Sequence, residues 1–198
     1  MKKRWIAPVL ALTLLVTACG NQASQQPATD DDQGSAPAKT EQTDKNTAAQ
    51  VSEEDIAQAK ADKEAAFDKF KELHADMDLT QFELSYENGR LVYDLEGEKD
   101  GQDVDVVLDA NDLSVVKDDL DNDDDATVDP AISKDMLAKI DALVDEAIKD
   151  RDGSYATSYS LSHDDGRWVL DVETKDQNKQ EVEYSYNLET GELIEKDA

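Results

Sequence analysis

One unit of sequence occurs twice in this chain, and this duplication limits the fold more than any other feature. The segment GRLVYDLE at 89–96 aligns with GRWVLDVE at 166–173, an offset of 77 residues. A self-match that continues over whole units with only loop-sized slips indicates two structural units of the same fold. The expected first unit, acidic linker and second unit are residues 52–119, 120–129 and 130–197.

Within each unit, apolar residues alternate with polar ones, which predicts β-strands with one buried face. The residues expected to face the core are Phe82, Leu84, Tyr86, Leu91, Tyr93, Leu95, Val104, Val106, Leu108, Tyr159, Leu161, Trp168, Leu170, Val172, Val182, Tyr184 and Tyr186. The pairs Asn88-Gly89, Asp100-Gly101 and Asp165-Gly166 are typical of tight hairpin turns, so the strands should pair antiparallel.

Each unit is expected to open with one amphipathic helix. The first should have Ser52 as its N-cap and an apolar stripe from Ile56 to His74, and the second should start after Ser133 and end near Arg151. One helix on a three- to four-stranded antiparallel sheet, in each of two tandem repeats, is an α+β fold. Because units of about 70 residues are marginally stable alone, a buried interface between them is also expected.

The N-terminus has the features of an export signal. Three basic residues precede an apolar stretch, Trp5 to Val16, which is too short to span a bilayer comfortably. The run Val16-Thr17-Ala18-Cys19 resembles a bacterial lipobox. The resemblance implies cleavage of a signal peptide at residues 1–18 and a diacylglycerol on the Cys19 sulfur, with the protein anchored at the extracytoplasmic face of the cell membrane. An ordinary signal peptide or an uncleaved anchor are the alternatives.

Residues 19–51 are predicted to form the lipid anchor and a disordered spacer. Beyond Cys19 this segment has no aromatic residue, and Val51 is its only large aliphatic one. Such a composition buries too little apolar surface to offset the entropy of ordering. The acidic run at residues 30–32 is interpreted as part of this solvated spacer.

The charge of the chain limits its partners. With 20 Lys+Arg against 48 Asp+Glu, the formal net charge is −28. Phosphates would be repelled, which argues against nucleic acid as a partner. Cys19 is the only cysteine, which excludes a disulfide framework within the chain and a Cys-rich zinc module.

No motif of a known catalytic or metal centre occurs, so we expect no enzyme, no cofactor and no metal site. His74 and His163 lack a His or Cys at ligand spacing and are interpreted as structural or surface residues. The aspartates between 121 and 125 are spaced as in a calcium loop, but Ala126 stands where that loop needs Gly. Arg90 and Arg167 are expected to form surface ion pairs.

The end of the second unit resembles the PepSY domain family. In Tyr184–Ile194 an apolar strand leads to Asn187, where the family has Asp, then to a Thr190-Gly191 turn and a final apolar strand. The first unit keeps the pattern at 106–110 but has Asp112-Leu113 in place of Thr-Gly. The resemblance implies a non-catalytic module of a kind proposed to restrain peptidases.

Three hypotheses for function remain open at this point. The first is a membrane-anchored extracytoplasmic binding module whose protein partner is, for example, an exported peptidase. The alternative is an acidic surface lipoprotein that buffers cations or acts as a structural or accessory envelope component. An enzyme with an unrecognised site is the least favoured.

Overall fold

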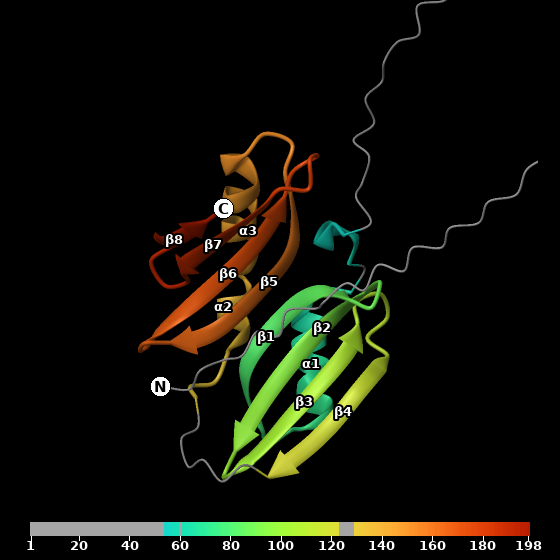
Figure 1. Ribbon diagram of the computed structural model, residues 1–198. Helices are drawn as coiled ribbons and strands as arrows, with labels where there is room; N and C mark the ends of the chain where they lie inside the picture. The colour runs from blue at the N-terminus through green and yellow to red at the C-terminus, as the bar shows by residue number, and fades with distance from the viewer. Residues whose placement is uncertain (1–53, 60, 123–128) are drawn as a thin grey trace, which may run out of the picture. The chain divides into compact units, whose positions relative to one another are not determined.

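The computed structural model describes residues 54–59, 61–122 and 129–198. Its central element is one antiparallel sheet of eight strands (Figure 1). The strands are Asp78–Glu87 (β1), Arg90–Lys99 (β2), Gln102–Asp109 (β3), Val115–Asn122 (β4), Tyr155–Asp164 (β5), Arg167–Lys175 (β6), Glu181–Asn187 (β7) and Leu193–Asp197 (β8). Their order in the sheet is β4-β3-β2-β1-β5-β6-β7-β8. The α+β class is confirmed, but the expectation of two separate sheets is wrong.

The two halves of the chain form one sheet because β1 and β5, the first strand of each half, pair side by side. Glu83 lies opposite Ser160, and these two residues are equivalent in the 77-residue self-match. Phe82 faces Leu161 next to them. The junction therefore lies close to a local two-fold axis. Pairing covers two strand edges that would otherwise be exposed, and it leaves β4 and β8 as the edges of the sheet.

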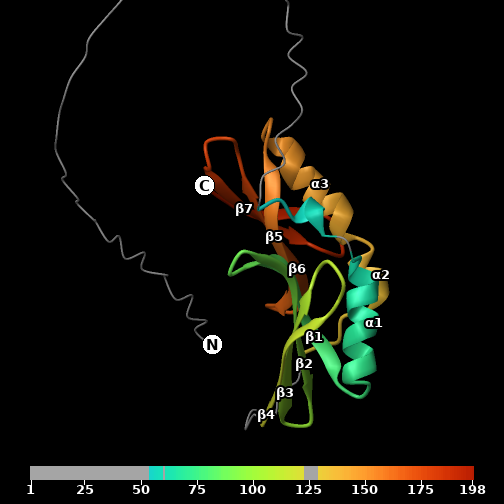
Figure 2. The ribbon, with the colours of Figure 1, turned by 90° about the vertical axis from the view of Figure 1, so that its right-hand side faces the viewer.

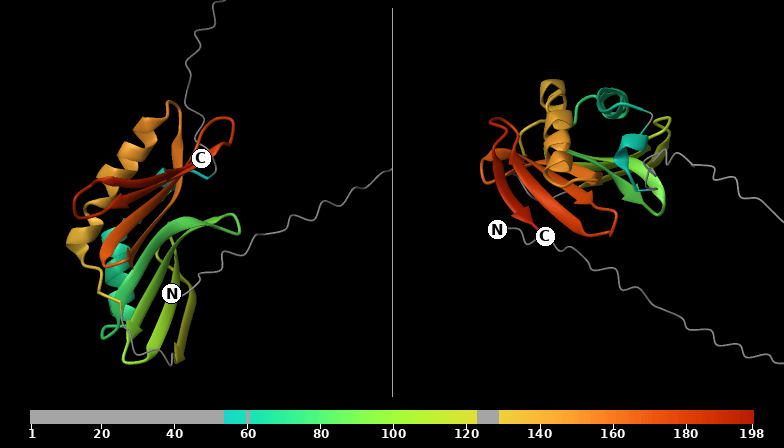
Figure 3. Two further views of the ribbon diagram at one scale, coloured as in Figure 1. Left: turned by 60° about the vertical axis from the view of Figure 1, so that its left-hand side comes forward. Right: turned by 90° about the horizontal axis from the view of Figure 1, so that it is seen from above.

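The long helices lie on one face of the sheet, as Figures 2 and 3 show. The helical elements are the 3₁₀ turn η1 (Ile56–Gln58) and the helices α1 (Lys63–Leu73), α2 (Lys134–Leu137) and α3 (Ile140–Asp150). The bounds of α1 and α3 differ by the same 77 residues as the self-match. No described element covers the opposite face of the sheet, which we call the open face.

Each half has a short helical turn before its long helix, where the sequence predicted one continuous helix. In the first half the side chain of Asp62 accepts a hydrogen bond from the Ala65 N–H at 2.7 Å and starts α1 as its N-cap. The expected cap, Ser52, lies outside the described residues. In the second half Ser133 precedes α2, and α3 ends one residue before Arg151, as predicted.

The core lies between the helices and the covered face of the sheet, and it contains most of the residues that the alternation predicted. The buried ones among them are Phe82, Leu84, Leu91, Tyr93, Leu95, Val104, Val106, Leu108, Tyr159, Leu161, Leu170, Val172, Val182, Tyr184 and Tyr186. Tyr86 and Trp168 are only half buried. Trp168 packs edge-on against His163, with 5.3 Å between ring centroids, so it belongs to the rim of the core.

The hairpin turns predicted from Asn-Gly and Asp-Gly pairs are confirmed. In the first of them Asn88 and Gly89 have φ values of 50° and 77°. The same pair of positive φ angles occurs at Asp100-Gly101 and at Asp165-Gly166. Two positive φ angles in a row are the geometry of the type I′ turn, whose twist matches that of the flanking strands.

The last hairpin of each half has one turn geometry in spite of different sequences. Gly191 has φ 74°, and its N–H donates to the Asn187 carbonyl at 2.8 Å. Leu113, at the equivalent place in the first half, has φ 59° and donates to the Asp109 carbonyl at 2.9 Å. Leucine in this left-handed conformation is strained, because its Cβ approaches the following carbonyl oxygen.

The irregular parts of the two halves also correspond. The register of β1 shifts within residues 79–81, and that of β5 shifts within residues 156–158. The threonine inside each bulge, Thr80 or Thr157, donates its hydroxyl proton to a carbonyl of the neighbouring strand, at 3.3 and 3.4 Å. A bulge bends its strand and fixes its register, so both halves bend their first strand at the same place.

Candidate functional site

The open face of the sheet is rich in acidic side chains. Its residues alternate along each strand with those that face the core. One row crosses all eight strands in register, and its members from β4 to β8 are Lys117, Val107, Asp94, Glu83, Ser160, Asp171, Ser185 and Glu195. This row places the carboxylates of both halves on one surface.

Asp94, on the open face, is a carboxyl group with a strongly raised pKa. Its Oδ1 atom is buried and has no hydrogen-bond partner among the described residues. Burial, together with the negative charges of Asp105 and Glu83, raises the pKa of Asp94 to about 7. Asp105 has a buried oxygen without a partner as well, while its other oxygen contacts Lys117. This part of the face can therefore take up a proton near neutral pH.

The equivalent aspartate of the second half has a different environment. Asp171 accepts a hydrogen bond from the Ser185 hydroxyl at 2.6 Å, and its neighbour on β5 is Ser160 in place of an acid. Further along the face, burial and then the charges of Asp171 and Glu173 raise the pKa of Glu183. Asp171 thus has a hydrogen-bond donor beside it, whereas the Oδ1 atom of Asp94 has none among the described residues.

On the helix side, a cavity of about 320 Å³ lies where the two halves join. We call it the junction pocket. The strands contribute Leu84, Tyr93, Ala156 and Tyr159. The helical segments contribute the apolar residues Ile56, Ala57, Ala59, Val144 and Ile148 and the charged residues Asp55, Asp62, Lys63, Asp141 and Asp145. Its size lies at the lower end of the range of about 300–1,000 Å³ that is usual for ligand sites.

The charged groups of the junction pocket are mostly negative. The single lysine among its lining residues, Lys63, donates to both carboxylate oxygens of Asp141 at 2.7 Å, and its side chain is only 11% exposed. This ion pair joins α1 to α3. Burial, and then the charge of Asp62, raise the pKa of Tyr93. Burial also raises the pKa of Tyr159, with Tyr93 and Asp141 adding to the effect. Both tyrosines are therefore neutral hydroxyls in a negative field.

The two edge strands expose apolar side chains. All residues of β4 and of β8 are exposed. The large apolar residues among them are Val115, Val116, Leu120, Leu193 and Ile194, which are 38–54% exposed. β4 runs to Asn122, so it includes three residues of the segment that the sequence assigned to the acidic linker. An edge with free backbone groups and apolar side chains can accept a further strand from another chain.

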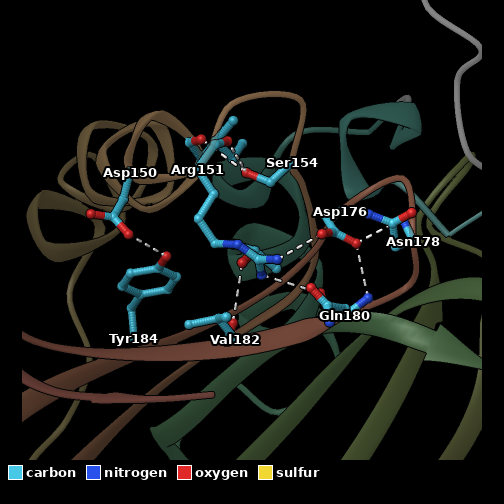
Figure 4. A network of polar contacts seen from close by, with 10 residues as sticks. Asp150, Arg151, Ser154, Asp176, Asn178, Gln180, Val182 and Tyr184 are labelled. Carbon is cyan, nitrogen blue, oxygen red and sulfur yellow. Dashed lines mark hydrogen bonds and ion pairs between the residues drawn. The ribbon is translucent and has the colours of Figure 1, made fainter.

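A network of polar contacts joins the end of α3 to the loop between β6 and β7 (Figure 4). Arg151 donates to an Asp176 oxygen at 2.8 Å and to the Gln180 carbonyl at 3.2 Å. The other oxygen of Asp176 accepts the Asn178 and Gln180 N–H groups at 2.7 and 3.0 Å. These backbone hydrogen bonds and Arg151 lower the pKa of Asp176. The network holds the β6–β7 loop against α3, and we interpret it as structural.

The residues that the sequence singled out do not come together in a site. Cys19, the predicted lipidation residue, lies outside the described residues. His74 follows α1 and lies 2.8 Å from an oxygen of Asp118 on β4, while His163 packs on Trp168. Arg90 lies 3.6 Å from Asp109 at the surface. None of these contacts brings His74, His163 and Arg90 together.

Two kinds of functional feature are absent from the described residues. Within 54–59, 61–122 and 129–198, no group of three or more His, Cys, Asp or Glu side chains is arranged to hold a metal ion. In the same part of the chain no helix has the length and apolar composition needed to cross a bilayer.

Sequence reasoning missed the junction pocket. Its signal lies in the self-match, where Leu79 and Phe67 of the first half correspond to the smaller Ala156 and Val144 of the second. That difference has a meaning only when the pairing of β1 with β5 is known, because the pairing places both halves around one cavity.

Comparison with known proteins relates the chain to one family. The family model described as "Peptidase propeptide and YPEB domain" (PepSY) matches residues 51–119. A crystal structure from Clostridium difficile 630, described as that of a "putative lipoprotein", has a similar fold, with a TM-score of 0.62 and 19% sequence identity. The alignment covers 73% of this chain and 98% of that one. No curated protein matches the sequence.

Proposed function

We propose that this chain, whose residues 51–119 match the PepSY family model, is a non-enzymatic binding module of the bacterial envelope that holds a protein partner at an edge of its sheet. An exported peptidase is the partner class that the family description suggests. The observation that carries the proposal is the pair of edge strands, β4 and β8, with exposed apolar side chains. Main-chain hydrogen bonds to such an edge supply affinity, and the side chains supply specificity.

Residues 130–197 are proposed to be a second repeat of the same type. Support comes from the common helix bounds, the matching bulges and the shared geometry of the last turn. In this proposal the tandem arrangement serves to join two PepSY units through β1 and β5 and to hold one binding edge at each end of the sheet.

The anchor of the module is proposed to be a lipid on Cys19, with residues 19–51 as the spacer to the folded part. The experiment is metabolic labelling with radioactive palmitate in a bacterial host. The parent chain should be labelled and recovered with the membrane, and the Cys19→Ala variant should be neither. Equal labelling of the two would reject the anchor without affecting the binding proposal.

Binding is tested with the full-length chain in detergent and the secreted peptidases of its own bacterium, fractionated by activity. We expect the chain to retain and inhibit at least one peptidase, and Leu120→Lys on β4 to reduce both effects, because a charge disfavours addition of an apolar strand. Ile194→Lys is the matched variant on β8 and identifies which edge is used. Retention and inhibition that neither variant changes would contradict edge binding.

A second candidate function is supported by the open face. The perturbed Asp94 and the neighbouring carboxylates would also suit an acidic lipoprotein that buffers cations near the cell surface. Calorimetric titration with calcium should then show weak binding at several sites, which Asp94→Asn diminishes. Absence of heat at millimolar calcium would remove this alternative.

A further inference from the structure

We propose that the junction pocket binds a basic side chain of a partner polypeptide, with the apolar stem of that side chain against the apolar lining and its cationic end among the carboxylates of the pocket. The inference rests on the proposed function only for the polypeptide nature of the partner. It concerns the helix side of the sheet and does not depend on the edges β4 and β8.

Two specific differences between the halves leave space for the junction pocket. Where the first half has Leu79 and Phe67, the second has Ala156 and Val144. Leu79 is fully buried and Phe67 packs against the core, so larger residues are accommodated at these positions of the fold. Leaving an apolar cavity unfilled costs stability. A pocket that a larger residue would fill is thus a feature that packing alone does not favour.

The charge of the junction pocket favours a cation over an anion. Four carboxylates line it, those of Asp55, Asp62, Asp141 and Asp145, and the one lysine of the lining is held by Asp141. Two of the remaining carboxylates, Asp55 and Asp62, cap η1 and α1 through backbone N–H groups, which fixes their positions without cancelling their charge. A cation entering from outside is attracted, and an anion is repelled.

The junction pocket combines an apolar lining with carboxylates, and a basic side chain matches both. Lysine and arginine carry a charged end on an apolar stem, and they bury the stem along apolar surface while the end stays polar. Leu84, Val144 and Ile148 supply apolar surface in the same lining as the carboxylates, while the buried rings of Tyr93 and Tyr159 pack against Phe82. A neutral apolar ligand would leave the carboxylates unused, and a small inorganic cation would leave the apolar surface uncovered.

The test uses the full-length chain in detergent and three probes followed by calorimetry. The probes are acetyl-Leu-Lys-Leu-amide, the same peptide with uncharged norleucine in place of Lys, and hexylamine. We expect the Lys peptide to bind at least about tenfold more tightly than the norleucine peptide, because charge complementarity at an interface is worth about this much or more. Equal binding of the two peptides would overturn the proposal. If hexylamine bound as tightly as the Lys peptide, the conclusion that the ligand is a polypeptide would be overturned.

Three variants locate the binding. Ala156→Leu, which installs the residue found at the equivalent position of the first half, should abolish binding of the Lys peptide while leaving thermal stability equal or higher. Asp145→Lys should weaken binding by about tenfold or more, since like charges repel at an interface. The adjacent Glu146 is not part of the pocket lining, so Glu146→Lys should weaken binding about twofold or less.

The outcomes separate this inference from the proposed function. Equal effects of Asp145→Lys and Glu146→Lys on peptide binding would show that the acidic surface attracts the peptide non-specifically. That result would overturn the junction pocket as the binding site. If Ala156→Leu fails to fold, the Asp145 and Glu146 pair still decides. Leu120→Lys on β4 should leave binding of the Lys peptide unchanged. If peptidase retention is also unchanged by the edge variants while the Lys peptide still binds, edge binding is rejected and the pocket proposal stands.

Discussion

The two halves of the sheet share their register but fill the space under their long helices in opposite ways. In the first half, the ring of Phe70 on α1 occupies the space above Gly97 on β2, and a Cβ at Gly97 would collide with it. In the second half the equivalent residues are Ala147 and Thr174, both fully buried. The large group comes from the helix in one half and from the strand in the other. One backbone thus accepts either arrangement when the total volume is kept.

The open face shows the same halves differing in charge. Asp94 has Glu83 and Val107 beside it, whereas the equivalent Asp171 has Ser160 and Ser185. A hydroxyl can donate to a carboxylate, and neither a carboxylate nor a valine can. Burial is the largest cause of the raised pKa of Asp94, and the charges of Asp105 and Glu83 add to it.

The largest effect is expected for Phe70→Ala, which should lower the free energy of unfolding by about 3–5 kcal/mol by leaving a cavity in the core. Gly97→Thr should destabilise through overpacking. The double variant reproduces the Ala147 and Thr174 pair, so it should be less destabilised than the sum of the single changes, with a coupling of about 1–3 kcal/mol. Urea unfolding measures all three. If the two single changes simply added in the double variant, the Ala147 and Thr174 pair would not compensate for the loss of the Phe70 and Gly97 pair.

Trp168→Ala should cost about 2 kcal/mol, less than the 3–5 usual for a fully buried aromatic residue, because Trp168 is only half buried. Its equivalent in the first half, Leu91, is 5% exposed. Leu91→Ala should therefore cost as much or more, about 2–5 kcal/mol, although leucine is the smaller residue. Thermal unfolding of the two variants compares them. A much larger loss for Trp168→Ala would place this tryptophan in the core.

Asp94→Asn should stabilise the chain at pH 8 and have no effect near pH 4. The pKa of Asp94 is about 7 in the folded chain, while an unfolded aspartate has lost its proton above about pH 4. Stability is therefore lost as the pH rises from about 4 to 7 and stays lower above that range. With allowance for solvent screening of a partly exposed group, the gain at pH 8 is about 1–2 kcal/mol.

The control for this prediction is the equivalent residue of the second half. Asp171→Asn weakens the hydrogen bond from Ser185 and should destabilise at pH 8 by about 1 kcal/mol. Urea unfolding at the two pH values gives all four numbers. Effects of equal sign for the two aspartates would contradict the difference between the halves.

The smallest effect is expected in the last turns. Gly191→Leu installs the residue that the first half has at this place, and it should lower the unfolding free energy by about 1 kcal/mol, because its φ of 74° disfavours a side chain. A Cβ there meets only the Leu143 side chain, at an ordinary 3.8 Å. Thermal denaturation detects the change. No loss of stability would mean that a leucine packs well enough in either turn to offset its strain.

Much of the fold could be predicted from the sequence because its signals are local. Alternation marked the buried face from Phe82 to Tyr186, and residue pairs such as Asn88-Gly89 fixed the turns. The helix break before Asp62 was missed, because the apolar spacing continues across it and a cap is recognised only by its hydrogen bond to Ala65. The burial of Trp168 was overestimated, because alternation tells which face a residue lies on and not how near the rim it is.

The candidate site was less accessible to sequence reasoning. Neither the edge-to-edge pairing of β1 with β5 nor the junction pocket has a local signal, since each depends on residues about 77 positions apart in the chain. The perturbed pKa of Asp94 likewise depends on its register with Glu83 and on the burial of its carboxyl group. Motif searches look for chemistry within short windows, and the groups gathered at this site come from four or more separate elements.

The central pairing of β1 with β5 also sets the distance between the two ends of the sheet. β4 and β8 are separated by seven strand spacings, or roughly 34 Å at about 4.8 Å per spacing. A single molecule that engaged a partner strand at each end would hold two strands at that separation. If the two strands belonged to one partner, the second would bind at a raised effective concentration. The sheet would then act as a spacer that fixes the distance between the two bound strands.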